Sequence, residues 1–179
     1  GNVIFNFLKK PLKDYKKYTS FSVVRGRGLE GKLGNKKIVI GNRTLMNEKN
    51  ISFREIEQQI KGWEEEGKTT MIVAENAKVI GAIAVADAVK EDSIKAISAL
   101  KMRGFRTVMI TGDNETTAKT IAKQIGIDEV IANVLPEEKA KKVEELQKRG
   151  MVAFVGDGIN DAPALKQSNV SIAMGSGSD

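Results

Sequence analysis

Short apolar runs, bounded by glycine and polar turn residues, recur along the first part of the chain and are typical of β-strands. Gly34-Asn35 has the composition of a tight hairpin turn and separates two of these strands. These runs predict a small antiparallel sheet with flanking helices, built from strands at residues 21–26, 28–33, 35–41, 69–74 and 79–86. Between the third and fourth strands, Ser52 and Glu55 have capping-box spacing and predict the start of a Glu-rich helix that ends near Glu66.

After residue 87 the pattern changes to helices and strands in regular alternation. Helices are expected at about 93–103 and from 115 to Gly126, where apolar residues recur at helical spacing, and another begins at Pro136 and ends near Gly150. Strands separated by helices of this length favour right-handed crossovers and a parallel sheet. The sequence therefore predicts an α/β fold with two domains, a smaller α+β domain at 1–76 and a doubly wound parallel sheet at 77–179.

The composition excludes several classes of chemistry. The chain of 179 residues contains neither cysteine nor histidine, so a disulfide scaffold, a thiol nucleophile, a histidine base and a Cys/His zinc site are all ruled out. The net charge of +6 lies entirely in the first part, because residues 1–76 hold 15 basic and 9 acidic residues while residues 77–179 hold 14 of each. The longest near-continuous apolar run, residues 79–86, is too short to cross a bilayer.

Two phosphate-loop patterns occur in a context that argues against their usual role. The stretch 62–69 fits G-x-x-x-x-G-K-T, but it follows a predicted helix and precedes a strand, the reverse of a P-loop. The stretch 26–31 fits G-x-G-x-x-G, yet it is followed by strand-like alternation where a dinucleotide fold requires a helix. The first is interpreted as a helix end and turn. The second is either a plain turn or a glycine turn where backbone closely approaches a ligand.

Polar residues of complementary type follow three strands of the second region. Their sequences are TGDN at 111–114, PEEK at 136–139 and GDGIND at 156–161. A phosphoryl group in transfer needs hydroxyl and amide donors, an ammonium group and a carboxylate-bound Mg²⁺, and the three stretches supply each of these. Ligands of parallel α/β sheets bind beyond the carboxyl ends of the strands. A phosphate site with magnesium is therefore expected where these three loops meet.

TGDN, PEEK and GDGINDAPAL, in this order and spacing, resemble the phosphorylation domain of P-type ion-transporting ATPases of the haloacid dehalogenase superfamily. IAVADAVK, GRGLEG, IGNRTLM and the GSGSD ending are similar to the heavy-metal-transporting subgroup. The resemblance implies that Thr111 and Gly112 bind the phosphoryl group and that Lys139 neutralises it. It further implies that Asp157 holds Mg²⁺ and that Asn160 and Asp161 complete the network around it. Asp113 would lie near the nucleotide.

The same resemblance implies ATP and Mg²⁺ as cofactors. Gly26 and Gly28 match the family's glycine pair beside the adenine nucleotide, Asn42 lies nearby, and Asp87 lies in the stretch that returns from the nucleotide-binding domain. The implied partners are the remaining parts of one transporter, namely its nucleophile segment, actuator domain and transmembrane helices, and a soft metal ion bound there. No nucleic-acid partner is implied.

One part of the family pattern is missing. The sequence has no D-K-T-G-T stretch, which carries the family's aspartate nucleophile, and no His-Pro pair. In the superfamily the nucleophile strand lies between the strands that end at Thr111 and Asp157. Its absence would leave backbone groups of two strands unpaired, each costing about 1 to 3 kcal/mol. We therefore expect this segment alone to be inactive and another polypeptide segment to complete the sheet.

These features predict the cytoplasmic part of an ATP-driven heavy-metal exporter at the cell membrane, with Cu⁺ as the first expected ion and zinc or cadmium next. The alternative enzyme is a free-standing magnesium-dependent phosphatase of the same superfamily with Asp87 as nucleophile. A third class, a nucleic-acid-binding module, would use the lysine-rich segment 1–18 with Tyr15 and Tyr18.

Overall fold

The computed structural model describes residues 20–86, 88–157 and 160–174. The basic segment 1–18, Asp87 and the GSGSD ending fall outside the described residues. The chain divides into two compact units, the first formed by residues 1–52 and 72–81 and the second by residues 53–71 and 82–179. The domain bounds expected from the sequence, 1–76 and 77–179, stay a prediction.

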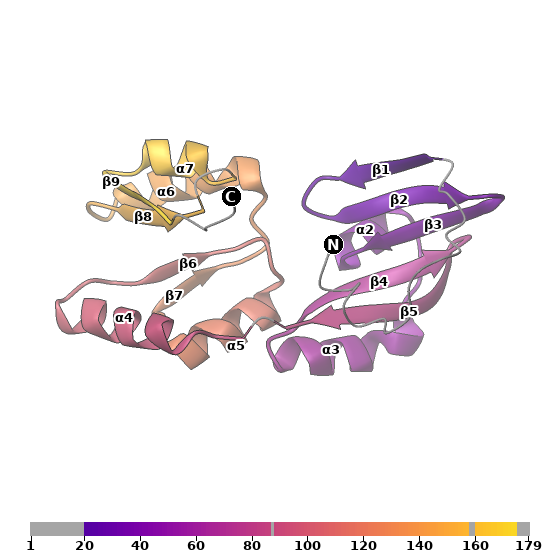
Figure 1. Ribbon diagram of the computed structural model, residues 1–179, viewed down its shortest axis with the longest axis horizontal. Helices are drawn as coiled ribbons and strands as arrows, with labels where there is room; N and C mark the ends of the chain where they lie inside the picture. Colours follow the sequence, from indigo (N-terminus) through magenta and orange to yellow (C-terminus); the bar gives the residue numbers. More distant parts are fainter. Residues whose placement is uncertain (1–19, 87, 158–159, 175–179) are drawn as a thin grey trace. The chain divides into compact units, whose positions relative to one another are not determined.

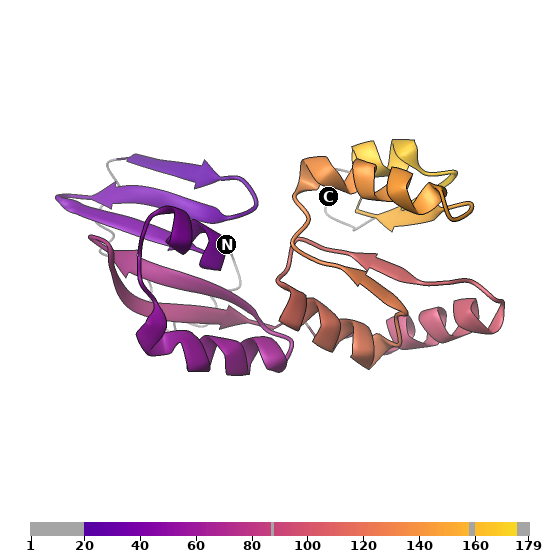
Figure 2. The same cartoon turned by 180° about the vertical axis from the view of Figure 1, so that it is seen from behind.

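The sheet is built from five strands in the order β1-β2-β3-β4-β5 (Figures 1 and 2), and its bounds are β1 Ser20–Val24, β2 Gly28–Leu33, β3 Lys36–Gly41, β4 Thr69–Glu75 and β5 Lys78–Val85. The first four strands pair antiparallel with their chain neighbours, which confirms the predicted antiparallel sheet. Its core in the first unit is apolar, with Val39, Leu45, Met46, Ile72 and Ala74 all at most 2% exposed.

A short helix after β3 was not predicted from the sequence. Helix α2, Arg43–Glu48, begins after Asn42, whose side-chain oxygen accepts a hydrogen bond from the Leu45 amide at 3.0 Å. Asn is among the best N-cap residues because its carbonyl satisfies an amide that has no partner within the helix. The helix packs against β3 and buries Leu45 and Met46 completely. Asn42 was the available signal for this helix.

The predicted capping box at Ser52 is wrong. The segment opens with a 3-10 turn, η1 Arg54–Ile56, and continues as α3, Glu57–Glu65. The N-cap positions are Phe53 and Ile56, and neither makes a side-chain cap hydrogen bond. The preceding Ile51 is buried and its amide donates to the Met46 carbonyl at 2.9 Å, which holds the chain against α2. Helical geometry therefore starts one residue too late for Ser52 to act as the cap.

The second unit alternates helices and strands as predicted. Its elements are α4 Glu91–Met102, β6 Val108–Ile110, α5 Glu115–Ile125, β7 Glu129–Ile131, η2 Pro136–Glu138, α6 Lys139–Gln147, β8 Ala153–Gly156, α7 Ala162–Gln167 and β9 Val170–Ala173. Helix α5 is capped as its sequence indicates, with Asn114 accepting from the Thr117 amide and Gly126 in the left-handed conformation.

The strands of this unit are parallel but form two pairs. β6 pairs with β7 and β8 pairs with β9, and these are two-stranded sheets within the part of the chain that the structure describes. Helices α4 and α5 accompany the first pair and α6 and α7 the second (Figures 1 and 2). The parallel α/β class is thus confirmed, and the doubly wound sheet is present here as two halves.

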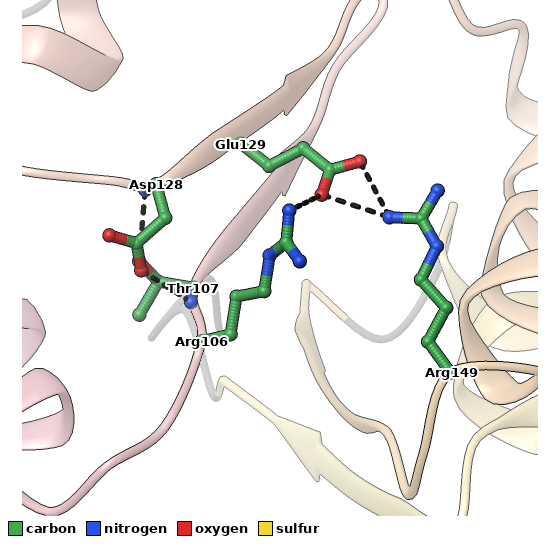
Figure 3. Close-up of polar contacts among 5 residues, drawn as sticks. All are labelled: Arg106, Thr107, Asp128, Glu129 and Arg149. Carbon is green, nitrogen blue, oxygen red and sulfur yellow. Dashed lines mark hydrogen bonds and ion pairs between the residues drawn. The ribbon is translucent and has the colours of Figure 1, made fainter.

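Polar contacts connect the segments that lead into β6 and β7 (Figure 3). The Thr107 amide and hydroxyl both donate to the Asp128 carboxylate, at 2.9 and 2.8 Å. Glu129 accepts from Arg106 at 2.8 Å and from Arg149 at 3.1 Å, and Arg149 follows α6 in the chain. Both arginine side chains are at least 60% exposed, so each ion pair adds about 1 kcal/mol or less.

Asp128 is expected to make the stability of this unit decrease as the pH falls into the acidic range. A hydrogen bond from Lys101, followed by the two from Thr107, holds the pKa of Asp128 well below its usual range. A carboxyl group whose pKa is lowered by folding contributes stability above its unfolded pKa, about 3.9, and loses it as the pH falls towards the folded pKa. We expect Asp128→Asn to flatten the acid side of the stability profile, measured as urea midpoints between pH 6 and pH 2.5. Parallel profiles for the two proteins would contradict this assignment.

Candidate phosphate and nucleotide sites

A buried ion pair lies beyond the end of β8. Lys139, the first residue of α6, places its Nζ 2.6 Å from Oδ1 of Asp161. Asp161 is 8% exposed, and its second oxygen accepts from the Asp157 amide at 3.4 Å. Lysine at a helix start is electrostatically unfavourable because the helix dipole favours anions there, so the Asp161 carboxylate compensates. The structure therefore brings together two predicted site residues that are 22 positions apart.

The Asp157 carboxylate organises the same loop. Its two oxygens accept hydrogen bonds from the backbone amide and the side-chain amide of Asn160, both at 3.2 Å. Asp157 and Asn160 are exposed, whereas Asp161 is buried, so the loop presents one carboxylate to solvent and keeps the other inside. This arrangement suits a direct ligand role for Asp157 and an internal role for Asp161.

Gly156 is required for this geometry, although the sequence analysis did not single it out. A Cβ at Gly156 would lie 2.6 Å from Oδ2 and 2.8 Å from Cβ of Asp161, which is closer than real Cβ contacts. The glycine at the end of β8 thus leaves the space that Asp161 occupies. The available signal was the first glycine of GDGIND, directly after the strand.

The loop after β6 is closed by its own side chains. The Thr111 hydroxyl donates to Oδ2 of Asp113 at 2.9 Å, and the Asp113 amide donates back to the hydroxyl at 3.1 Å. The Thr111 carbonyl accepts from the Val134 amide at 3.0 Å, and the Asp113 carbonyl accepts from the Asn133 amide at 2.8 Å. Gly112 between them is exposed, with its backbone accessible.

These contacts place the Thr111 loop next to the segment that leads to Lys139. Only Leu135 and the single 3-10 turn η2 separate Val134 from Lys139, and Lys139 in turn pairs with Asp161. The loop at 111–114 therefore contacts the segment before Lys139, and Lys139 contacts the loop at 156–161. That they meet around one phosphate stays a prediction.

The predicted nucleotide residues lie together in the first unit. The side-chain amide of Asn42 donates to the Gly26 carbonyl at 3.3 Å, and its backbone amide donates to the Arg27 carbonyl at 2.9 Å. Gly26 and Gly28 both have positive φ, at 68° and 147°. The turn between β1 and β2 is therefore fixed against the start of α2. Asp87, also predicted for this site, lies outside the described residues.

The donor set fits Mg²⁺ only together with a phosphate. Among the residues that the structure describes, no group of three or more acidic side chains could hold a metal by itself. Asp157 and Asp161 offer two carboxylates, of which Asp161 is engaged by Lys139 and a backbone amide. Magnesium commonly takes one or two carboxylates and completes its octahedron with substrate phosphate and water. The pair is adequate for such a site.

Comparison with known proteins gives a consistent set of relatives. A family model for haloacid dehalogenase-like hydrolases matches residues 3–169. A copper-exporting P-type ATPase of Staphylococcus saprophyticus is 45% identical, over 90% of this chain and 20% of its own length. A copper-exporting P-type ATPase of Staphylococcus haemolyticus is also 45% identical, over 100% of this chain and 23% of its own length. The chain thus spans about a fifth of the length of these relatives.

Solved structures agree with the sequence relatives. The catalytic domain of the CPx-ATPase CopB-B, described in relation to nucleotide binding, is 25% identical with a TM-score of 0.71, over 99% of this chain and 62% of that one. A zinc-transporting PIB-type ATPase in its E2.Pi state is 36% identical with a TM-score of 0.54, over 93% of this chain and 26% of that one. The predicted resemblance to heavy-metal P-type ATPases is confirmed. No helix within the described residues has the length and apolar character needed to span a bilayer.

Proposed function

Because the chain belongs to the haloacid dehalogenase-like hydrolases, we propose that it is the ATP-binding and phosphoryl-transferring part of a heavy-metal P-type ATPase. The observation that carries this proposal is the buried Lys139–Asp161 pair beside Asp157 at the end of a parallel strand. An ammonium group and a solvent-facing carboxylate at one strand end are what transfer of a phosphoryl group to an aspartate requires. The relatives named as copper-exporting and zinc-transporting support the same class.

Each loop has a part in binding the phosphoryl group. The Thr111 hydroxyl and the Gly112 amide donate to its oxygens, and Lys139 offsets the negative charge that spreads over them in the transition state. Asp157 would hold Mg²⁺, with Asn160 orienting its carboxylate and Asp161 orienting Lys139. Bound Mg²⁺ would neutralise phosphate charge, and Asp113, whose amide donates to the Thr111 hydroxyl in the same loop, is proposed to lie near the nucleotide.

The glycine turn of the first unit supports ATP binding. Gly26 and Gly28 carry no side chains that would hold a ligand away from the backbone, and Asn42 fixes the turn from the other side. The excess of positive charge in the first part of the sequence suits a polyphosphate. ATP and Mg²⁺ are therefore the proposed cofactors.

The aspartate nucleophile is proposed to come from a separate segment of the same transporter. β6 and β8 each have one hydrogen-bonded strand neighbour within the described ranges, so each has an edge that a further strand can pair with. Apolar side chains around the two halves are exposed, including Phe105 at 58%, Val155 at 54% and Ile172 at 46%. A strand paired with the free edge of β8 would lie beside Val155. An actuator domain and transmembrane helices are the further proposed partners.

The transported ion is proposed to be Cu⁺, with zinc or cadmium as the second choice. The copper-exporting relatives at 45% identity support this order. The proposed site for the ion lies in membrane helices, and the segment described here acts at the cytoplasmic face of the cell membrane. The free-standing phosphatase is not favoured, because the relatives are ion-transporting ATPases.

Phosphorylation by ATP tests the proposal. With γ-labelled ATP and Mg²⁺, a full-length transporter that carries this chain is expected to form an acid-stable, hydroxylamine-sensitive phosphoenzyme on the aspartate of its D-K-T-G-T segment. Residues 1–179 alone are expected to remain unlabelled and to become labelled when the upstream segment is supplied. Label on the isolated chain that disappears in Asp87→Asn would instead establish the phosphatase.

A further inference from the structure

The turn between α3 and β4 is hydrogen-bonded to α5 and to the loop before it. The Thr69 hydroxyl donates to Oδ1 of Asp113 at 2.9 Å, and the Thr117 hydroxyl donates to the Lys68 carbonyl at 2.9 Å. A third bond runs from the Thr120 hydroxyl to the Glu65 carbonyl at 3.3 Å. All of these residues belong to the second unit. This turn is the end of the G-x-x-x-x-G-K-T pattern at 62–69, to which no function has yet been assigned.

The Asp113 carboxylate is shared by two threonines. Oδ1 accepts from Thr69 and Oδ2 accepts from Thr111, the residue proposed to bind the phosphoryl group. A carboxylate next to a phosphate site repels the phosphate unless donors hold its oxygens elsewhere. A hydroxyl has a single proton to donate, so the Thr111 proton cannot serve both Asp113 and a phosphate oxygen. Because Thr69 donates a second hydrogen bond to this carboxylate, the carboxylate depends less on the hydrogen bond from Thr111.

The bond from Thr117 keeps the turn in place. Thr117 is fully buried, and its hydroxyl also accepts from the side chain of Asn114 at 2.9 Å while donating to Lys68. Asn114 caps α5 and directly follows Asp113. Gly67 has φ +82°, and a Cβ there would come within 3.4 Å of the Thr120 methyl group. The turn is thus joined to α5 on the N-terminal side of Thr69, at Lys68 and Glu65.

We propose that Thr69 is a positioning residue for phosphoryl binding, which holds Asp113 away from the phosphate and releases the Thr111 hydroxyl to donate to it. The proposal rests on the function proposed above and adds a residue outside the three family loops. β4 begins at Thr69, so the chain passes directly from this contact into the sheet of the first unit.

The test compares Thr69→Val, Thr69→Ser and Thr120→Val in a full-length transporter that carries this chain. Orthovanadate, a phosphate analogue, is the probe, and its inhibition constant is measured together with the Kd of ATP in the absence of Mg²⁺. A hydrogen bond to a charged group is expected to change affinity by about tenfold. Thr69→Val should therefore weaken vanadate inhibition about tenfold with little change in ATP affinity. Thr69→Ser should restore it, and Thr120→Val, which removes a bond of the same turn without touching Asp113, should resemble wild type.

The outcomes separate the two proposals. Equal effects of Thr69→Val and Thr120→Val, or a failure of Thr69→Ser to restore vanadate inhibition, would overturn the role of Thr69. In that case the wild-type protein would still form a phosphoenzyme from ATP. Absence of any phosphoenzyme in the wild-type transporter would refute the proposed function itself. A double variant with Asp113→Asn adds a further check, because the effect of Thr69→Val should largely disappear once the carboxylate is neutral.

Discussion

Lys139→Met is expected to destabilise the second unit by about 3 kcal/mol, because it leaves the Asp161 carboxylate buried without its counter-ion. The two side chains are 19% and 11% exposed and 2.6 Å apart, so solvent screens the pair only weakly. Methionine preserves the length and apolar stem of lysine, which isolates the loss of charge. The free energy of unfolding is measured by urea titration of the 179-residue chain. In the full-length transporter, phosphoenzyme formation should fall by about two to three orders of magnitude.

Lys142→Met is the matched control, on the same helix. Lys142 pairs with Glu145 at 2.9 Å, but the side chains are 32% and 42% exposed, so solvent screens the pair and the expected loss of stability is far smaller. Adding Asp161→Asn to Lys139→Met should recover part of the lost stability, since no buried charge then remains, whereas activity should stay low. Equal losses for Lys139→Met and Lys142→Met would show that the Lys139–Asp161 pair carries no special energy.

Most elements could be predicted because their signals are local. Asn114 and Gly126 cap α5 through contacts within a few residues, and Gly34-Asn35 forms the predicted turn between β2 and β3. The failures have a physical cause that is not local. Ser52 has the right neighbour for a capping box, but the burial of Ile51 decides where the helix starts. Tertiary packing overrode the short-range pattern.

The site shows the same division. Residue type and order indicated phosphate chemistry at Lys139 and Asp157, yet sequence could not show that Lys139 pairs with Asp161, because α6 and β8 separate them. Thr69 was missed for a related reason. Its bond to Asp113 spans 44 positions, and the pattern around it imitates a P-loop with the wrong flanking elements. Contacts between loops that are far apart in the sequence are set by the tertiary structure, and in this chain such contacts lie at the ends of strands.

Gly28→Ala is expected to destabilise the first unit by about 3 kcal/mol, through clash and backbone strain together. A Cβ at Gly28 would lie 2.1 Å from the Ile40 carbonyl oxygen and 2.5 Å from the Gly41 Cα, both of them backbone atoms that cannot rotate away. Its φ of +147° is a conformation that residues with a side chain rarely adopt. Gly28 faces Gly41 across β2 and β3, so the two strands approach closely next to the turn between β1 and β2 that contains Gly26.

Gly34→Ala provides the comparison within the same sheet. Gly34 also has positive φ, +61°, but a Cβ there would meet no atom within 4 Å, so only the conformational cost of about 1 kcal/mol remains. The difference between the two variants, measured by urea unfolding, therefore reports the close approach of β2 to β3. Because the clash pushes β2 away from β3 beside Gly26 and Asn42, ATP affinity measured by calorimetry should fall in Gly28→Ala and stay close to wild type in Gly34→Ala. A Gly28→Ala protein with wild-type stability would mean that β2 and β3 do not pack as closely as described.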